Sequence, residues 1–199
     1  MRHYSTDSYY HVFNRGVARQ NIFLDDADKQ YFLRLFDRHL NAKTKQLNKL
    51  GLPYKCLADN LELLAYCLMD NHFHMFYYLD QDLTALSECM KSIGTAYTMY
   101  FNLRYKRVGP VFQGVFRASR ISSDAYLLHI TRYIHLNPRY YKTYKYSSLP
   151  AYLGVDTTPW LKPDKILRLF SNQDYIAFLT DYKEHKEMLE VSKHELANY

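Results

Sequence analysis

The sequence lacks the features that mark secreted, zinc-stabilised or membrane proteins. Its three cysteines, Cys56, Cys67 and Cys89, are odd in number and have no zinc-like spacing, so they indicate reduced thiols. No apolar run approaches the roughly 18 residues that a membrane helix needs. The first residues, MRHYSTDSYYHVF, contain no apolar stretch of the signal-peptide kind. We therefore expect a cytoplasmic protein without a membrane partner.

Acidic residues are scarce in the middle of the chain. Residues 91–155 hold ten lysines and arginines but one acidic residue, Asp124, whereas both flanking segments are close to neutral. A basic segment between neutral ones favours a polyanionic partner such as nucleic acid over a merely solvated basic face. With 199 residues, of which 48% are hydrophobic, the chain is expected to form one globular domain, with or without an appendage.

The patterns along the chain predict both strands and helices. The segment 8–17 alternates apolar and polar residues and ends in Asn-Arg-Gly, which predicts a strand and a turn. Two further strands within 56–80 would pair as antiparallel neighbours across a short Asp-Asn turn. Helices are expected in 25–43, 82–107 and 123–138, and a loop or small hairpin in 108–122. This order predicts an α+β fold, a ferredoxin-like or RRM-like antiparallel sheet with helices on one face.

The stretch LMDNHFHMF (68–76) places two histidines one residue apart in an apolar run. On a strand, His72 and His74 point to the same face, about 6.5 Å apart along the chain. Two imidazoles on one face can share a metal ion, but two ligands are too few for a closed zinc site. One interpretation is an open site for a catalytic divalent ion such as Mg²⁺ or Mn²⁺. The other is two half-exposed histidines on the surface of a sheet.

The segment LLHITRYIHLNPR (127–139) places His129, Tyr133 and Asn137 at intervals of four residues. They share one helix face, beside an apolar stripe that can dock the helix on the sheet. The amide oxygen of Asn137 is a candidate third ligand for a hard ion, and the Tyr133 hydroxyl would lie beside that ion. His129 is expected to be a packing or DNA-facing residue.

Several of these segments, in order, resemble a known family. MDNHFHMF is similar to the His-hydrophobe-His motif of the HUH endonucleases, and RYIHLNPR resembles the Tyr-Ile-x-x-Asn-Pro helix of their single-tyrosine transposases. The segments YHVFNRGVARQNIFLDDADKQYFLRLF, MKSIGTAYTMYFNLRYKRVGPVFQGVFRAS and DAYLLHITRYIHLNPR also follow that family. The resemblance covers residues 8–153 and is closest to the REP-associated tyrosine transposases, relatives of the insertion-sequence-200-like transposases.

The resemblance implies an enzyme that cleaves and rejoins single-stranded hairpin DNA through a 5′-phosphotyrosine intermediate. Tyr133 would be the nucleophile, and His72 and His74 would bind Mg²⁺ or Mn²⁺, with Asn137 as the third ligand. Asn137 departs from the glutamine of insertion-sequence relatives and is shorter by one methylene. Residues 1–140 would form the catalytic domain and 141–199 a helical C-terminal extension packed on it.

The DNA would be bound by basic residues interleaved with aromatic side chains. The segment YFNLRYKRVGPVFQGVFRASR (100–120) has this mixture, with Tyr105, Phe112 and Phe116 as candidate stacking residues. The expected partner, by resemblance, is a palindromic hairpin with a short single-stranded flank, and the expected location is the nucleoid. The candidate DNA-binding residues are Arg15, Arg19, Arg104, Lys106, Arg107, Arg117, Arg120 and Arg132.

Three other functions stay open at this point. A ferredoxin-like sheet can bind RNA or DNA by stacking, without chemistry. A metal-dependent phosphoesterase can use activated water in place of a tyrosine, and a domesticated, inactive descendant would only bind hairpins. Insertion-sequence relatives are dimers that share active sites between subunits. Here the region 140–199 could cover that surface, so we expect a monomer rather than a homodimer.

Overall fold

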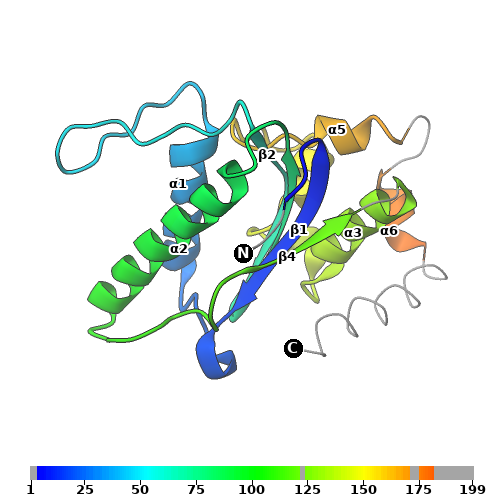
Figure 1. Ribbon diagram of the computed structural model, residues 1–199. Helices are drawn as coiled ribbons and strands as arrows, with labels where there is room; N and C mark the ends of the chain where they lie inside the picture. The colour runs from blue at the N-terminus through cyan, green and yellow to red at the C-terminus, as the bar shows by residue number, and fades with distance from the viewer. Residues whose placement is uncertain (1–3, 122–123, 171–174, 182–199) are drawn as a thin grey trace.

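A computed structural model describes residues 4–121, 124–170 and 175–181. At its centre lies a four-stranded antiparallel sheet with the strand order β2-β3-β1-β4 (Figure 1). β2 and β3 form a hairpin whose turn is Asp70-Asn71, as the sequence predicts. The strands are β1 (Ser8–Arg15), β2 (Leu61–Met69), β3 (His72–Leu79) and β4 (Arg117–Ile121).

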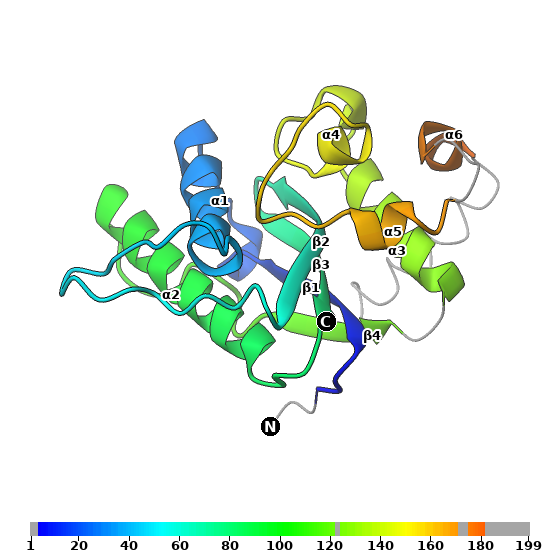
Figure 2. The same ribbon diagram turned by 90° about the horizontal axis from the view of Figure 1, so that it is seen from above.

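Helices cover both faces of the sheet (Figures 1 and 2). α1 (Asp26–Leu40) and α2 (Ala85–Arg104) pack side by side on one face. On the opposite face lie α3 (Asp124–Leu136), α4 (Leu149–Tyr152), α5 (Asp164–Leu167) and α6 (Tyr175–Thr180). Two 3-10 turns, η1 (Val17–Arg19) and η2 (Tyr141–Thr143), belong to the loops. The predicted α+β antiparallel sheet is confirmed, while the expectation of helices on one face holds for α1 and α2 only.

Side chains of the sheet belong to two separate hydrophobic cores, because successive side chains of a strand point to opposite faces. Phe73, Met75 and Tyr77 of β3 face α1 and α2, whereas Phe76 faces α3. Burial on both faces explains why β2 and β3 are nearly continuous apolar runs, LELLAYCLM and HFHMFYYL. The histidines of β3 are therefore polar exceptions on a buried face.

α1 begins where its sequence predicts. The Asp25 carboxylate caps the helix by accepting the backbone N–H of Asp28 at 3.1 Å. Acidic residues in the first turn and basic residues in the last turn suit the helix dipole. Phe32, Leu35 and Phe36 recur at helical spacing and are fully buried, each contributing about 1.5–3 kcal/mol of hydrophobic stabilisation. This buried face anchors α1 to the sheet.

The segment after α3 covers the outer edge of β2. The backbone N–H of Leu68 donates to the Tyr146 carbonyl at 2.9 Å, and that of Lys162 donates to Leu63 at 2.8 Å. These contacts occupy an edge that would otherwise be open to another chain. The predicted domain boundary at residue 140 falls between α3 and η2, and residues 182–199 of the predicted extension lie outside the described residues. Within the described residues, none of the helices combines the length and the apolar character of a membrane span.

Candidate active site

β3 and α3 bring the predicted histidines, tyrosine and asparagine together. His72 and His74 lie on the face of β3 that α3 covers, as strand alternation predicts. The apolar stripe of α3 is buried in the core on this face. Tyr133 Oη lies 3.4 Å from His74 Nε2, and Asn137 Oδ1 lies 3.2 Å from His72 Nε2. All four side chains meet within one chain.

Hydrogen bonds determine which nitrogen of His72 faces the site. Its Nδ1 lies 2.6 Å from Asn71 Oδ1, and the Asn71 amide donates to the Arg19 carbonyl at 3.4 Å, which turns its oxygen toward the histidine. Burial lowers the pKa of His72, so the ring is neutral and has one N–H to donate. In the tautomer that donates to Asn71, the Nε2 lone pair faces Asn137 Oδ1, which is also an acceptor. A cation between these two acceptors would satisfy both.

A third histidine supports His74 in a similar way. His74 Nδ1 lies 2.9 Å from His11 Nε2 on β1, and the two rings stack with 5.1 Å between centroids. Burial lowers the pKa of His11 to about 3 and that of His74 well below its ordinary value. A neutral pair shares one proton in this contact. When His74 is the donor, its Nε2 lone pair is directed at Tyr133.

The donor set fits a divalent metal ion. Two imidazole Nε2 atoms and the Asn137 amide oxygen form a mixed nitrogen and oxygen donor set that could hold such an ion, with water or substrate in the remaining positions. In the part of the chain that is described, no group of three His, Cys, Asp or Glu side chains could hold a metal, so the amide is needed to complete the set. Metal-ligating histidines commonly engage their second nitrogen with a supporting partner. Asn71 and His11 are such partners here.

Tyr133 is buried at the inner wall of the site, with 5% of its surface exposed. Burial raises the pKa of its phenol above the ordinary value near 10, and a hydrogen bond with Asn137 acts in the opposite direction. A buried phenol keeps its proton at neutral pH unless positive charge lies next to it. A nucleophilic role for Tyr133 therefore needs nearby positive charge.

A cavity of about 260 Å³ lies in front of the two histidines and Tyr133. Arg15, Arg19 and Arg117, three of the predicted DNA-binding residues, line it together with Gln113. Arg15 Nε donates to Gln113 Oε1 at 2.5 Å, which orients this guanidinium at the cavity wall. Arginine is well suited to phosphate because its N–H groups can bind two oxygens at once. The cavity thus brings three arginines together with a tyrosine.

The turn after β1 places Arg19 at this rim and requires glycine at its start. A Cβ on Gly16 would lie 2.0 Å from the Gln20 carbonyl oxygen. Ala18 and Arg19 themselves adopt positive φ values of 51° and 60°, a region that side chains disfavour. The Gly16 N–H donates to the Asn71 carbonyl at 2.8 Å, so the turn is tied to the β2–β3 hairpin.

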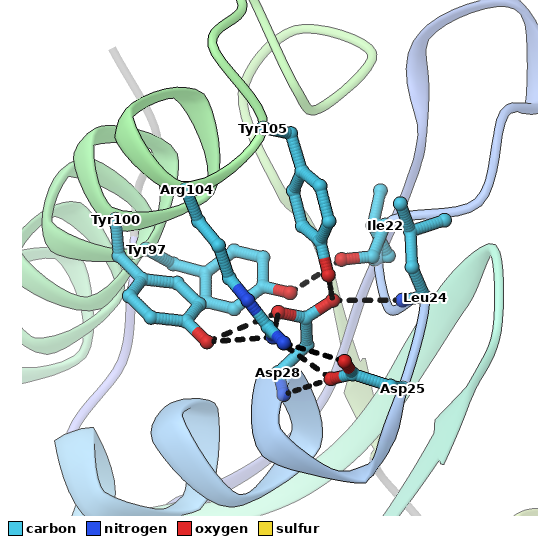
Figure 3. A network of polar contacts seen from close by, with 8 residues as sticks. All are labelled: Ile22, Leu24, Asp25, Asp28, Tyr97, Tyr100, Arg104 and Tyr105. Carbon is cyan, nitrogen blue, oxygen red and sulfur yellow. Dashed lines mark hydrogen bonds and ion pairs between the residues drawn. The ribbon is translucent and has the colours of Figure 1, made fainter.

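Arg104, predicted to bind DNA, takes part in a network of hydrogen bonds and ion pairs between α1 and α2 (Figure 3). Its guanidinium donates to Asp25 Oδ2 and Asp28 Oδ1, both at 2.5 Å. Asp28 is fully buried and also accepts from Tyr100 at 3.1 Å and Tyr105 at 2.9 Å. The network joins the end of α2 to the start of α1. Arg104 and Tyr105, a candidate stacking residue, thus have a structural role in this network, while DNA binding by the exposed Arg104 stays a prediction.

Arg132 was also predicted to bind DNA and is buried, with 1% of its surface exposed. It donates to the Phe178 carbonyl at 2.5 Å, and its guanidinium lies 3.7 Å from the centre of that ring, a cation–π contact. This prediction is wrong, because a charge along the sequence does not reveal whether its helix face is covered.

The His129 ring, 6.3 Å from the Phe178 ring, also lies away from the cavity. DNA binding by three further residues that do not line the cavity stays a prediction: Lys106, Arg107 and Arg120.

The sequence patterns did not reveal two residues of the site, His11 and Gln113. His11 occupies an alternating strand segment, but its relation to His74 depends on the register of β1 against β3, in which Phe13 is the direct partner of His74. Gln113 lies in a loop that has no periodic pattern. Both positions result from tertiary structure rather than from local spacing.

The sheet, the His-x-His strand and the tyrosine helix docked on it define an HUH-type fold. The family model described as "Transposase IS200 like" matches residues 4–137. The chain belongs to this family of IS200-like transposases. Among solved structures it is similar to a REP-associated tyrosine transposase bound to a REP hairpin, with a TM-score of 0.57 and 12% sequence identity over 81% of this chain and 95% of that chain. No curated protein matches the chain.

Proposed function

We propose that the protein is a DNA transposase that cleaves and rejoins single-stranded, hairpin-containing DNA through Tyr133. One observation carries this proposal: Tyr133, His72 and His74 line one cavity together with three arginines, and Asn137 Oδ1 lies 3.2 Å from His72 Nε2. A phosphodiester in this cavity would have its non-bridging oxygens near the arginines and its phosphorus near the phenol. Membership of a transposase family supports this reading of the site.

We propose that His72, His74 and Asn137 hold Mg²⁺ or Mn²⁺. Such an ion, when bound, offsets negative charge on the phosphate and favours the phenolate form of Tyr133. The partners on the other side of the rings, Asn71 and His11, accept the δ N–H groups and leave the ε nitrogens as ligands.

In the proposed cleavage step, Tyr133 Oη attacks the phosphorus. A bond forms between the tyrosine oxygen and the 5′ phosphate, and the bond from phosphorus to the 3′ oxygen breaks. The phenol proton is transferred, in net terms, to the 3′ oxygen, which leaves as a hydroxyl. In rejoining, a 3′-hydroxyl attacks the phosphotyrosine and the proton returns to Tyr133, so the bond is conserved without a nucleotide cofactor.

The proposed partner is a DNA hairpin with an unpaired flank. The basic segment 91–155, the arginines of the cavity and the hairpin bound by the structurally similar transposase support this choice. We propose a monomer acting at the nucleoid in the cytoplasm, since the described site draws on one chain. Residues 1–140 would be its catalytic domain and 141–199 its extension.

The test is adduct formation between the protein and a labelled hairpin with a single-stranded flank, followed on a denaturing gel with Mg²⁺, Mn²⁺ or chelator. The wild type should form a metal-dependent adduct. Tyr133→Phe should form none yet still bind DNA, because phenylalanine keeps the buried ring and removes only the hydroxyl. Tyr140→Phe is the matched control, since Tyr140 is 71% exposed and should not affect the adduct.

Each competing function has its own outcome in this experiment. Cleavage by Tyr133→Phe without an adduct would identify a phosphoesterase that uses activated water. Tight binding with no adduct across many hairpin sequences would identify a binding module or an inactive descendant. Either result would overturn the assignment of Tyr133 as the nucleophile.

A further inference from the structure

A second hollow, larger than the cavity, lies between α2 and the loop 108–116. It has a volume of about 1050 Å³, at the upper end of the roughly 300–1,000 Å³ typical of ligand sites. Figure 1 shows this loop returning from the end of α2 to the sheet. We call this hollow the α2 groove. Its apolar walls include Phe32, Met90, Ile93, Met99, Val111, Phe112, Val115 and Phe116.

The α2 groove adjoins the candidate active site. Asn14 and Phe73 line both the groove and the cavity in front of Tyr133. The loop forms the partition, because Gln113 lines the cavity whereas Phe112 lines the groove. Two backbone hydrogen bonds, of 2.8 and 3.0 Å, tie this loop to the end of β1 and to η1. A strand whose phosphate reaches Tyr133 therefore has the groove as its neighbour.

α2 is hollowed at Gly94, where the groove runs along the helix. A Cβ added there would meet no atom within 4 Å. Glycine is disfavoured in the interior of a helix, so close packing does not account for it here. Met99 and Val115, which also line the groove, are 68% and 70% exposed, although apolar side chains of this size usually gain from burial. The groove thus exposes the apolar side chains of Met99 and Val115 beside the site, above walls of more deeply buried apolar residues.

We propose that the α2 groove binds unpaired bases of the DNA strand that passes through the active site, an inference that rests on the proposed function. Bases have apolar faces and polar edges, which suits apolar walls that also carry Thr95, Thr98 and Asn14. The charge agrees with a nucleic acid occupant rather than an apolar peptide, because residues 91–121 contain no Asp or Glu. The exposed cations of that stretch are Lys91, Arg104, Lys106, Arg117 and Arg120.

The test compares two hairpins on the full chain, one blunt and one with unpaired flanks that carry 2-aminopurine. The wild type should bind the flanked hairpin about tenfold more tightly, as expected for stacking of one or more bases, and quench the 2-aminopurine fluorescence. Gly94→Trp should fill the groove, remove this tenfold preference and the quenching, and leave affinity for the blunt hairpin unchanged. Leu103→Trp, the matched control, adds the same ring to α2 at a position that is 84% exposed and outside the groove, and should behave as the wild type.

A second variant tests the proposal in case the Gly94→Trp variant does not fold. Val115→Asp places a negative charge on an exposed position of the groove and should weaken binding of the flanked hairpin several-fold. Wild-type indifference to the flank, or unchanged quenching in both variants, would overturn the proposal. A dimer that Gly94→Trp abolishes would assign the groove to a second copy of the chain and overturn it as well.

Adduct formation separates this proposal from the proposed function. An adduct at Tyr133 with no effect of the flank would reject the groove and retain the transposase chemistry. Flank-dependent quenching without an adduct would retain the groove as a base-binding site and reject the chemistry.

Discussion

Replacing His11 with phenylalanine tests the geometric argument for the metal site. His11 is not a proposed ligand and acts through its 2.9 Å contact with His74 Nδ1. Phenylalanine keeps a ring in the stack but offers no acceptor. A buried N–H without a partner costs about 1–3 kcal/mol, and the ring avoids this by moving its proton to Nε2, where the metal would bind. Either response weakens the ligand, so metal affinity should fall about 10–100-fold.

Calorimetric titration with Mn²⁺, with circular dichroism as the folding check, measures this effect. His11→Gln is the matched control, because its amide oxygen lies as many bonds from Cα as the lost Nε2 and can accept the same N–H. Glutamine should restore most of the affinity that phenylalanine removes. Wild-type Mn²⁺ affinity in a folded His11→Phe variant, or equal losses in both variants, would refute the supporting role of His11.

Two further predictions concern charge. Arg117→Ala should weaken hairpin binding and reduce the slope of log affinity against log salt by about one, whereas Arg132→Met should leave that slope unchanged, because Arg132 is buried against Phe178. Burial lowers the pKa of His135 to about 3, so between pH 6.5 and 3 the unfolded chain binds a proton that the folded chain does not. Stability should therefore fall with acid by about 1.4 kcal/mol per pH unit from this residue, a slope that His135→Gln should remove in urea melts.

The strand and helix that build the site could be predicted because their signals are local. Alternation in HFHMFYYL places His72 and His74 on one face of β3, and spacing by four brings Tyr133 of α3 and Asn137, the residue directly after α3, to the same side. The family resemblance supplied the roles. Periodicity does not say which side of a sheet a helix covers, so α3 was expected beside α1 and α2.

The error at Arg132 and the unpredicted ion pairs of Arg104 have a common physical cause. A basic residue in the sequence carries no information about its partners in the fold. Arg104 meets two carboxylates from α1, and Arg132 meets the Phe178 ring from α6. His11 was not predicted as a site residue, because only the pairing of β1 with β3 brings it to His74.

The two halves of the site are attached to the molecule in different ways. β3 is an inner strand, hydrogen-bonded to β2 on one edge and β1 on the other, so His72 and His74 have little freedom to move. α3 contacts the sheet through side chains, and Tyr133 moves with that helix. Substitutions in the apolar stripe of α3 would therefore displace the Tyr133 hydroxyl and the Asn137 amide together, while the two imidazoles stay in place. In a lineage of such proteins, the distance between the hydroxyl and the histidines could then change without any substitution in the sheet.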